Sequence, residues 1–250
     1  MAGLAAGLAA VLALATGCGG SSHASTTDEV VVFAAASLTE PFQRMADEVE
    51  AKHPGLDVTL SFGGSSSLAP QIVSGAPADV FASASPDTMQ LAIDGGAVAE
   101  DPVLFAHNRL LIAVPVGNPA GIEKLADLAD PDLKLALCAP EVPCGAAAQK
   151  ALKSGDVVTE PVTFETDVKA VLSKVLLGEV DAGLVYRTDV LAADGQVVGL
   201  EFEESAEAVN YYAIAPLTEA PNPEGAQMFI EFVQSKRGRA ILRDAGFGIR

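Results

Sequence analysis

Short runs of apolar residues alternate along the chain with stretches in which apolar residues recur at every third or fourth position. The short runs predict β-strands, and the recurring spacing predicts amphipathic helices. Strands are expected at 30–33, 56–62, 78–84, 108–115, 133–139, 181–186, 196–202 and 208–216. Helices are expected at 41–52, in a short segment ending at 75, at 122–129, 145–153 and 166–177, and through 222–250. This alternation predicts an α/β fold with parallel strands and helices on the sheet faces.

Local signals refine the helix predictions. Thr39 is expected to cap the helix that begins at Pro41, because a hydroxyl caps a first turn well and proline fits into it. Gly238 is expected to break the closing helical segment. The buried stripe of that segment is expected to consist of Met228, Phe229, Phe232 and Val233.

Composition and charge narrow the functional class. Half of the 250 residues are hydrophobic, which is enough for one large domain or two small lobes. The formal net charge of −18 argues against nucleic acid and against an anionic membrane surface as partners, because both select basic proteins. Acidity that only keeps the protein soluble is the plain alternative explanation of this charge.

The first residues have the pattern of an export signal. Their apolar stretch is shorter than the ~20 residues of a membrane span, and it predicts a signal peptide at 1–17. Cys18 lies in LATGCGGSS, which resembles a bacterial lipoprotein box, so lipid is expected on its sulfur and a flexible tether at 18–27. Ala15 stands where leucine is more usual, and no Lys or Arg precedes the apolar run. A plain cleaved signal or an uncleaved anchor is the alternative.

Two cysteines remain beyond the export signal. Cys138 and Cys144 flank the proline-containing segment APEVP, and disulfides persist in the compartments that exported proteins occupy. A disulfide between them is favoured, and two free thiols are the alternative. A metal site is not indicated, because His53 and His107 are remote in the sequence and no zinc pattern is present.

Four helix starts share small residues and unpaired backbone N–H groups, and three of them also offer a hydroxyl group. They lie in AAASLTEP, SFGGSSSLAPQI, APEVPCGAAAQKAL and ETDVKAVL. Helix N-termini carry partial positive charge, and in open α/β sheets they face the ligand crevice. Small residues let an anion approach these N–H groups closely. A single serine at a helix start is usually a cap, but four such junctions favour an anion site.

Signatures of enzymes are missing from the sequence. It contains no G-x-S-x-G elbow, no P-loop and no Rossmann glycine fingerprint. A Ser-His-Asp set would have to recruit His53 or His107. Neither catalysis nor a cofactor is therefore expected, and a serine hydrolase that uses Ser37 or Ser65 is the alternative of a different class.

Five segments resemble molybdate-binding proteins, the extracytoplasmic receptors of molybdate ABC importers. They are VFAAASLTEPFQ, SFGGSSSLAPQIVSGAPADVFASAS, PEVPCGAAAQKAL, GEVDAGLVYRTDV and FIEFVQSKRGRAILRDAGF. The first two and GLVYRTD are specific for that family, whereas the last is common among solute receptors. The resemblance implies a two-lobed periplasmic-binding-protein fold of type II, closing on a tetrahedral oxyanion. Each lobe would hold a mixed, mostly parallel sheet flanked by helices, and two crossing strands would join the lobes.

The resemblance also implies which residues hold molybdate. Ser37 and Ser65 would each offer a hydroxyl and a backbone N–H, with Ser66 as the register alternative to Ser65. The hydroxyl of Tyr186 would donate a further hydrogen bond.

Two further contacts implied by the resemblance come from the backbone. Cys144 and Val168 would contribute N–H groups. Cys144 departs from the alanine expected at its position, and a contact through the backbone tolerates that change. Asp167, beside the site, is expected to cap its helix and to face away from the anion, because a carboxylate facing the anion would repel it.

The expected function is therefore a lipid-anchored receptor outside the cytoplasm. It would bind molybdate and tungstate as a monomer and deliver them to the membrane permease and ATPase of an ABC importer. One lobe is expected at 28–106 plus 208–250, and the other at 107–207. Every argument from helix ends applies equally to the alternative of a receptor for another tetrahedral oxyanion such as sulfate. A structural or adhesion lipoprotein without a small ligand is the further alternative.

Overall fold

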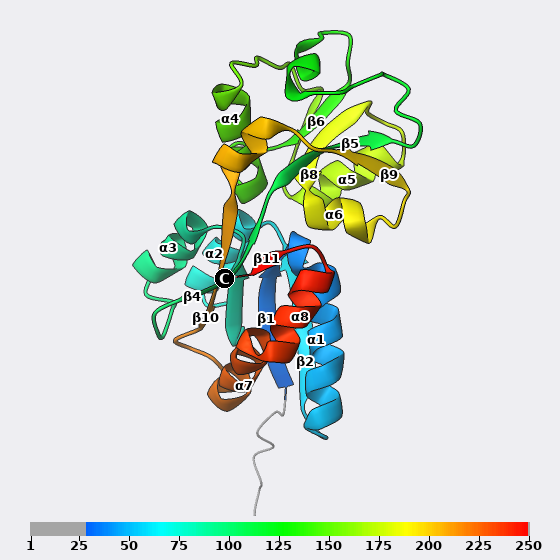
Figure 1. Cartoon of the computed structure of the whole chain (residues 1–250). Helices are drawn as coiled ribbons and strands as arrows, with labels where there is room; N and C mark the ends of the chain where they lie inside the picture. The colour runs from blue at the N-terminus through cyan, green and yellow to red at the C-terminus, as the bar shows by residue number, and fades with distance from the viewer. Residues whose placement is uncertain (1–28, 250) are drawn as a thin grey trace, which may run out of the picture.

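Residues 29–249 are described by the computed structural model and form two lobes, each built on its own β-sheet (Figure 1). The first sheet contains β1 (Glu29–Ala35), β2 (Asp57–Gly63), β3 (Val80–Ser83), β4 (Val103–Asn108), β10 (Asn210–Pro216) and β11 (Gly248–Ile249). The second contains β5 (Leu110–Pro115), β6 (Leu135–Cys138), β7 (Thr163–Glu165), β8 (Ala182–Tyr186) and β9 (Val197–Leu200). Their strand orders are β11-β4-β10-β3-β1-β2 and β7-β6-β8-β5-β9.

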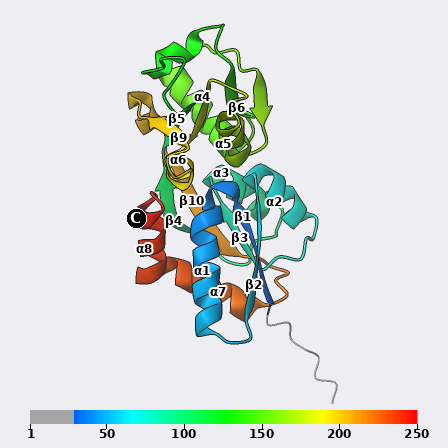
Figure 2. The ribbon, with the colours of Figure 1, turned by 90° about the vertical axis from the view of Figure 1, so that its right-hand side faces the viewer.

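Helices cover both sheets, and Figure 2 shows them from the side. The first lobe contains α1 (Thr39–Lys52), α2 (Ser65–Val73), α3 (Pro86–Asp94), α7 (Pro223–Gln234) and α8 (Lys236–Asp244). The second contains α4 (Pro143–Ser154), α5 (Val168–Leu176) and α6 (Arg187–Ala192). Short 3₁₀ helices are η1 (Ala36–Leu38), η2 (Leu125–Ala129) and η3 (Glu203–Ala208).

The alternation of side chains along β1 decides which helices cover each face of the first sheet. Val30 and Val32 lie in the apolar core formed with α1, α7 and α8. Val31 and Phe33 pack against the core under α2 and α3, because successive strand residues point to opposite faces. The second lobe has a separate apolar core. Each lobe is thus stabilised by its own buried apolar surface. The region between the lobes is not needed for either core and can therefore hold a binding site.

Two chain segments connect the lobes, as expected from the resemblance. Strand β4 continues into β5 with only Arg109 between them, and η3 leads from the second lobe into β10. Asn108 at the end of β4 pairs with Asn210 at the start of β10, so the two connections lie side by side (Figure 1). Asn108 Nδ2 donates to Thr188 Oγ1 at 2.9 Å, and Asn210 Nδ2 donates to the carbonyl of Ala84 at 3.0 Å.

The predicted α/β architecture with mixed sheets is confirmed. Strand β1 pairs in parallel with β2 and β3, and β6 pairs in parallel with β7 and β8. Strands β5 and β10 each pair antiparallel with both of their neighbours. Sequence reasoning missed α3, α6, β4, β7 and β11. Helix α6 and strands β7 and β11 are short, so periodicity has few residues in which to appear. Helix α3 and strand β4 are as long as α5 and β5, so length does not explain their absence from the prediction.

Several local predictions are wrong. Thr39 does not cap α1: it is the first residue of that helix, and its hydroxyl donates to the carbonyl of Ala36 at 2.7 Å. The segment predicted as a helix at 122–129 is the 3₁₀ helix η2. The helix predicted from 166 begins at Val168, because Asp167 is its N-cap.

The closing segment also differs from its prediction. The break between α7 and α8 lies at Ser235, whose hydroxyl accepts from the N–H of Gly238 at 3.0 Å and caps α8. Phe229 and Val233 are buried as predicted, whereas Met228 and Phe232 are half-buried. The remaining buried side chains of α7 are Ala226 and Ile230.

The expected signal peptide at 1–17, lipidation of Cys18 and the tether at 18–27 lie outside the described residues. Among residues 29–249, no helix is long and apolar enough to span a bilayer.

Candidate functional site

A small cavity between the lobes is lined by all five residues predicted to hold the ligand. They are Ser37, Ser65, Cys144, Val168 and Tyr186. Small residues form most of the remaining wall, with Ala35, Ala36, Gly63, Gly64 and Ala84 from the first lobe and Val142, Pro143 and Asp167 from the second. The space open to the centre of a water-sized sphere is about 20 Å³, slightly more than one water molecule needs. The cavity therefore suits a small ion rather than a sugar or an amino acid.

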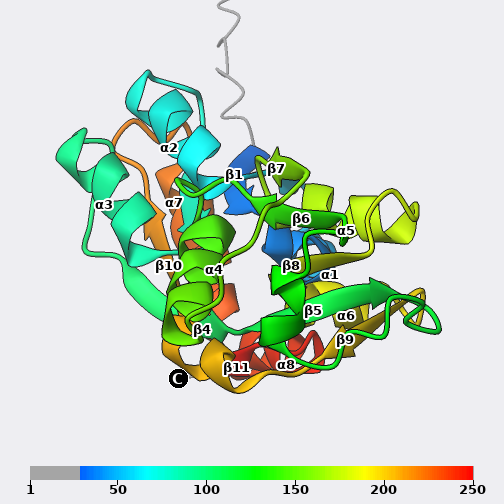
Figure 3. The ribbon, with the colours of Figure 1, turned by 90° about the horizontal axis from the view of Figure 1, so that it is seen from above.

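The N-terminal ends of three helices meet at this cavity. Helix α2 begins at Ser65, α4 begins one residue before Cys144, and α5 begins at Val168. The N–H groups of a first helical turn have no intrahelical acceptor, and the helix dipole places partial positive charge there. Figure 3 views the molecule from above, with the second lobe toward the viewer. In this view α4 lies in front of β10, and α5 lies near α1. The arrangement presents N–H donors from both lobes to one small space, which favours an anion.

Two glycines permit the close approach of backbone around the cavity. A Cβ atom on Gly64 would lie 2.4 Å from the carbonyl oxygen of Thr166 in the other lobe. A Cβ atom on Gly145 would lie 1.8 Å from the carbonyl oxygen of Ala139. Glycine is therefore required at Gly64 for the two lobes to touch, and at Gly145 for α4 to begin beside the preceding loop.

Ser37 is buried and is hydrogen-bonded to a residue that the sequence reasoning missed. Its Oγ lies 2.7 Å from the hydroxyl of Tyr212 on β10. Burial raises the pKa of Tyr212 above its usual value, so this phenol stays protonated at neutral pH. When Tyr212 donates to Ser37, the proton of Ser37 is left for a ligand. The signal for Tyr212 in the sequence is weak, because it is an apolar-flanked tyrosine in a buried strand.

The geometry distinguishes Ser65 from its register alternative Ser66. Ser65 is buried, lines the cavity and accepts the N–H of Ala84 at 3.0 Å, so its hydroxyl proton stays available. Ser66 donates to the carbonyl of Glu141 at 2.8 Å, which is a contact between the lobes. Of the two, Ser65 is the one that faces the cavity.

Tyr186 closes strand β8 and is 1% exposed. Its hydroxyl is buried without a hydrogen-bond partner among the described residues. Burial, helped by nearby Tyr212 and Asp189, raises the pKa of Tyr186 well above its usual value. A neutral buried donor without a partner is costly unless a ligand satisfies it. Since Tyr186 lines the cavity, its hydroxyl is an unused donor at the site.

The loop before α4 is held by a disulfide. Cys138 at the end of β6 is bonded to Cys144 in α4, with their Cα atoms 5.7 Å apart. Both residues are buried. The cysteine at the predicted contact position is therefore part of a cross-link, and its backbone N–H belongs to the first turn of α4.

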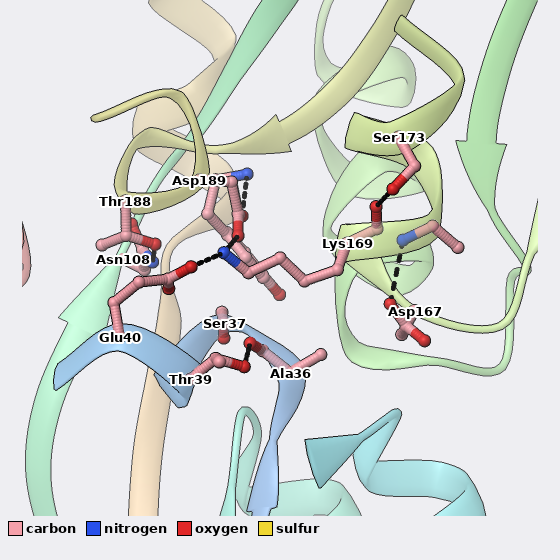
Figure 4. A network of polar contacts seen from close by, with 12 residues as sticks. Ala36, Ser37, Thr39, Glu40, Asn108, Asp167, Lys169, Ser173, Thr188 and Asp189 are labelled. Carbon is pink, nitrogen blue, oxygen red and sulfur yellow. Dashed lines mark hydrogen bonds and ion pairs between the residues drawn. The ribbon is translucent and has the colours of Figure 1, made fainter. Parts of the chain in front are cut away.

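Asp167 has the capping role expected of it, although it also belongs to the cavity wall rather than lying away from it. Its Oδ1 accepts the N–H of Ala170 at 3.0 Å, and Asp167 is the N-cap of α5 (Figure 4). The cap leaves the N–H groups of Val168 and Lys169 in the first turn of the helix.

No lysine, arginine or histidine of the described chain lines the cavity. Within residues 29–249, no cluster of three His, Cys, Asp or Glu residues has the arrangement of a metal site. The Ser37 hydroxyl is bonded to a tyrosine, and neither His53 nor His107 lines the cavity, so the serine hydrolase alternative lacks a general base. The arrangement can bind an anion through neutral donors.

A larger hollow of about 390 Å³ adjoins the cavity on the far side of Val142 and Pro143. Its wall includes Asp87, Glu141 and Lys150, so it combines charges of both signs. Ser37, Ser65 and Tyr186 do not line it. The smaller cavity is therefore the candidate site.

Comparison with known proteins agrees with this geometry. A family model described as bacterial extracellular solute-binding protein matches residues 30–248. The molybdate-binding protein ModA of Mycobacterium bovis is 40% identical over 254 residues, covering 98% of this chain and 97% of that protein. YvgL of Bacillus subtilis, a putative ABC transporter substrate-binding lipoprotein, is 30% identical and covers 96% of each chain.

One solved structure is similar in both sequence and fold. It is the substrate binding domain of a putative molybdenum ABC transporter from Clostridium difficile, with a TM-score of 0.67 and 26% identity. The match covers 89% of this chain and 99% of that one.

Proposed function

Because the chain belongs to the family of bacterial extracellular solute-binding proteins, we propose that it captures molybdate in the cavity between its lobes for an ABC importer. Members of this family are solute-binding proteins rather than enzymes, and they act outside the cytoplasm. The similarity to ModA of Mycobacterium bovis over 98% of this chain supports molybdate as the ligand.

One observation carries the proposal. The five residues implied by the resemblance come from separate segments, yet they line one cavity of ionic size. Ser37, Ser65 and Tyr186 supply hydroxyl groups, and Cys144 and Val168 supply N–H groups from helix ends. Each hydrogen bond to a charged partner contributes about 1.5–3 kcal/mol, so a handful of such bonds can hold a dianion without an opposite charge.

Neutral donors also explain selectivity and release. A protonated oxyanion carries its own O–H donor, which would meet other donors in this wall rather than an acceptor. An anion held without an ion pair leaves no unpaired buried cation behind when it departs. Tungstate has the same charge and tetrahedral arrangement of oxygens, so it is expected to bind as well. Sulfate has the same charge and shape but is smaller, so the titration below has to distinguish it from molybdate.

Delivery and anchoring extend the proposal. The lipoprotein box at Cys18 and the similarity to a putative substrate-binding lipoprotein of Bacillus subtilis support a lipid anchor. The tether at 18–27 would hold a monomeric receptor near the permease and ATPase. Opening and closing would take place at the two connections between lobe 28–106 plus 208–250 and lobe 107–207.

Calorimetric titration of the mature chain with molybdate, tungstate, sulfate and phosphate tests the proposal. Molybdate and tungstate are expected to bind at one site per chain, and more tightly than the other two anions. Preference for sulfate would contradict the ligand assignment while keeping an oxyanion receptor. Binding of none of the four, together with an unchanged melting temperature, would contradict a receptor for tetrahedral oxyanions altogether.

A further inference from the structure

The side chain of Lys169 reaches from the second lobe to the first. Its Nζ lies 2.6 Å from Oε1 of Glu40 on α1 and 3.5 Å from Oδ1 of Asp189 on α6 (Figure 4). Glu40 belongs to the first lobe, whereas Lys169 and Asp189 belong to the second. The ammonium group therefore lies between one carboxyl group of its own lobe and one of the opposite lobe.

The contact joins two segments that border the cavity, one from each lobe. Lys169 directly follows Val168, and Glu40 lies three residues after Ser37. Both Val168 and Ser37 line the cavity. An ion pair at this place holds the two sets of donors at the separation that the structure shows.

Asp189 fixes the lysine within its own lobe. The side chain of Asp189 is fully buried, and its Oδ2 accepts the backbone N–H of Tyr186 at 3.1 Å. Its other oxygen, Oδ1, faces Lys169 and has no hydrogen bond to any of the described residues. Separation of the lobes would break the contact with Glu40 and keep the contact with Asp189, because only the first partner lies across the cleft.

We propose that Lys169 is an interlobe latch, whose ion pair with Glu40 forms on closure of the cleft and slows the release of the bound oxyanion. The identity of that oxyanion rests on the proposed function, whereas the effect on closure does not. Lys169 does not line the cavity. It would act by holding the two lobes together and is therefore a positioning residue.

The expected size of the effect is modest. The side chains of Lys169 and Glu40 are 24% and 48% exposed, so solvent screens their attraction. Ion pairs of this exposure change equilibria by about two- to five-fold. The latch should act on the dissociation rate, because it exists only in the closed state. A general attraction of the anion by the lysine would instead act on the association rate.

The test uses Lys169→Met, Glu40→Gln and the double variant, with Lys169→Arg as the conservative replacement. A matched control is Glu48→Gln, since Glu48 lies on the same helix α1 and pairs with Arg237 within the first lobe. Release of radiolabelled molybdate is followed after addition of excess unlabelled molybdate. Small-angle scattering of the ligand-free proteins measures the spread of the lobes without any ligand.

Dissociation is expected to be about two- to five-fold faster in Lys169→Met and in Glu40→Gln. It should be no faster in the double variant than in Lys169→Met, restored in Lys169→Arg and unchanged in Glu48→Gln. The ligand-free double variant should have a larger radius of gyration than the wild-type chain, because loss of the ion pair lowers the population of the closed state in the ligand-free chain as well.

An unchanged dissociation rate together with an unchanged radius of gyration would overturn the latch. Fully additive effects of the two single variants would overturn it as well. If molybdate binds to none of the proteins, the proposed function fails, and the scattering comparison still decides whether the latch holds the lobes together.

Discussion

The hydroxyl oxygens of Ser37 and Tyr212 lie 2.7 Å apart, in a buried hydrogen bond between the start of the first helical segment and strand β10. This bond orients the one polar side chain in the run AAAS and, with Tyr212 as the donor, leaves the proton of Ser37 for a ligand. Tyr212 is fully buried and packs edge-on against Phe105 and Phe247. The position of Ser37 is therefore set by the core of the first lobe.

Replacement of Ser37 by Ala is expected to weaken molybdate binding by more than tenfold, because a hydrogen bond to a charged partner contributes about 1.5–3 kcal/mol. Tyr212→Phe keeps the Ser37 hydroxyl but removes its orientation, so a smaller loss of about three- to tenfold is expected. Calorimetry gives both affinities, and circular dichroism checks the fold. Equal affinity of Ser37→Ala and the wild-type chain would show that this loop does not contact the anion.

Tyr186→Phe is expected to have opposite effects on binding and on stability. The hydroxyl has no partner in the described part of the ligand-free chain, so its removal should leave the free energy of unfolding unchanged or raise it by about 1–2 kcal/mol. The same change should lower molybdate affinity by tenfold or more. Urea unfolding and calorimetry measure the two quantities. A destabilised variant with normal affinity would assign the hydroxyl a structural role.

Gly64→Ala is expected to hold the lobes apart. The backbone of Gly64 has φ −61° and ψ 128°, which alanine adopts without strain, so the first lobe should stay stable. The added Cβ would meet the carbonyl oxygen of Thr166 at 2.4 Å and prevent full closure. Molybdate affinity should fall by tenfold or more while the melting temperature of the ligand-free chain changes little. Gly96→Ala, at a glycine with open space around it, is not a suitable control because its φ is +71°.

A useful comparison for Gly64→Ala is Gly63→Ala, at the last residue of β2, because Gly63 also lines the cavity and its replacement tests the cavity wall without the clash between lobes. A Cβ atom there would meet only the side chain of Leu68, at 3.6 Å, which is ordinary contact. Normal binding by Gly64→Ala would show that the ligand does not need the closed arrangement.

Asp189 should make stability depend on pH. Burial raises the pKa of Asp189 from 3.8 to about 7, against the opposing effects of Lys169 and the Tyr186 N–H, while Glu40 adds to the rise. Between these two values the folded chain retains a proton that the unfolded chain has lost. The free energy of unfolding therefore falls as pH rises through this range.

The variant that tests this is Asp189→Asn, which does not titrate. Between pH 5 and pH 8 the wild-type chain should lose about 3 kcal/mol of stability relative to Asp189→Asn. Urea unfolding of both proteins at a series of pH values gives the difference. A difference that stays constant over this range would mean that Asp189 is ionised throughout.

Because Cys138 and Cys144 form a disulfide, two of the three cysteines have no free thiol. If Cys18 carries lipid or is removed, the non-reduced mature protein is expected to have no titratable thiol. Thiol counting with a chromogenic disulfide reagent under denaturing conditions measures this directly. Reduction is expected to loosen the loop before α4 and to weaken molybdate binding, because Cys144 lies in the first turn of that helix. Two thiols per chain would mean that the bridge does not form in the exported protein.

Much of the fold follows from local pattern. Strand β1 could be predicted because Val30, Val31, Val32 and Phe33 form an uninterrupted apolar run, and α5 because Val168, Val171, Leu172 and Val175 share one helical face. Helix α3 was missed although Ser85 caps it and Pro86 opens it. Each of these two signals is weak alone, and only their combination indicates a helix start.

The site, too, can be predicted from the sequence only in part. The helix ends at Ser37, Ser65 and Val168 could be predicted because each is a local arrangement of small residues and hydroxyl groups. Tyr212 lies 175 positions from Ser37, and Lys169 lies 129 positions from Glu40. Such pairs depend on how the two lobes meet. No local period carries that information, so only the folded structure shows them.

The most direct test of the central claim is a crystal structure of the mature chain with molybdate, recorded so that the anomalous signal of molybdenum locates the ion. The account predicts one strong peak in the cavity between the lobes, with ligand oxygens within hydrogen-bond distance of the Ser37, Ser65 and Tyr186 hydroxyls and of the Cys144 and Val168 N–H groups. A peak elsewhere on the chain, or an empty cavity at saturating molybdate, would contradict it.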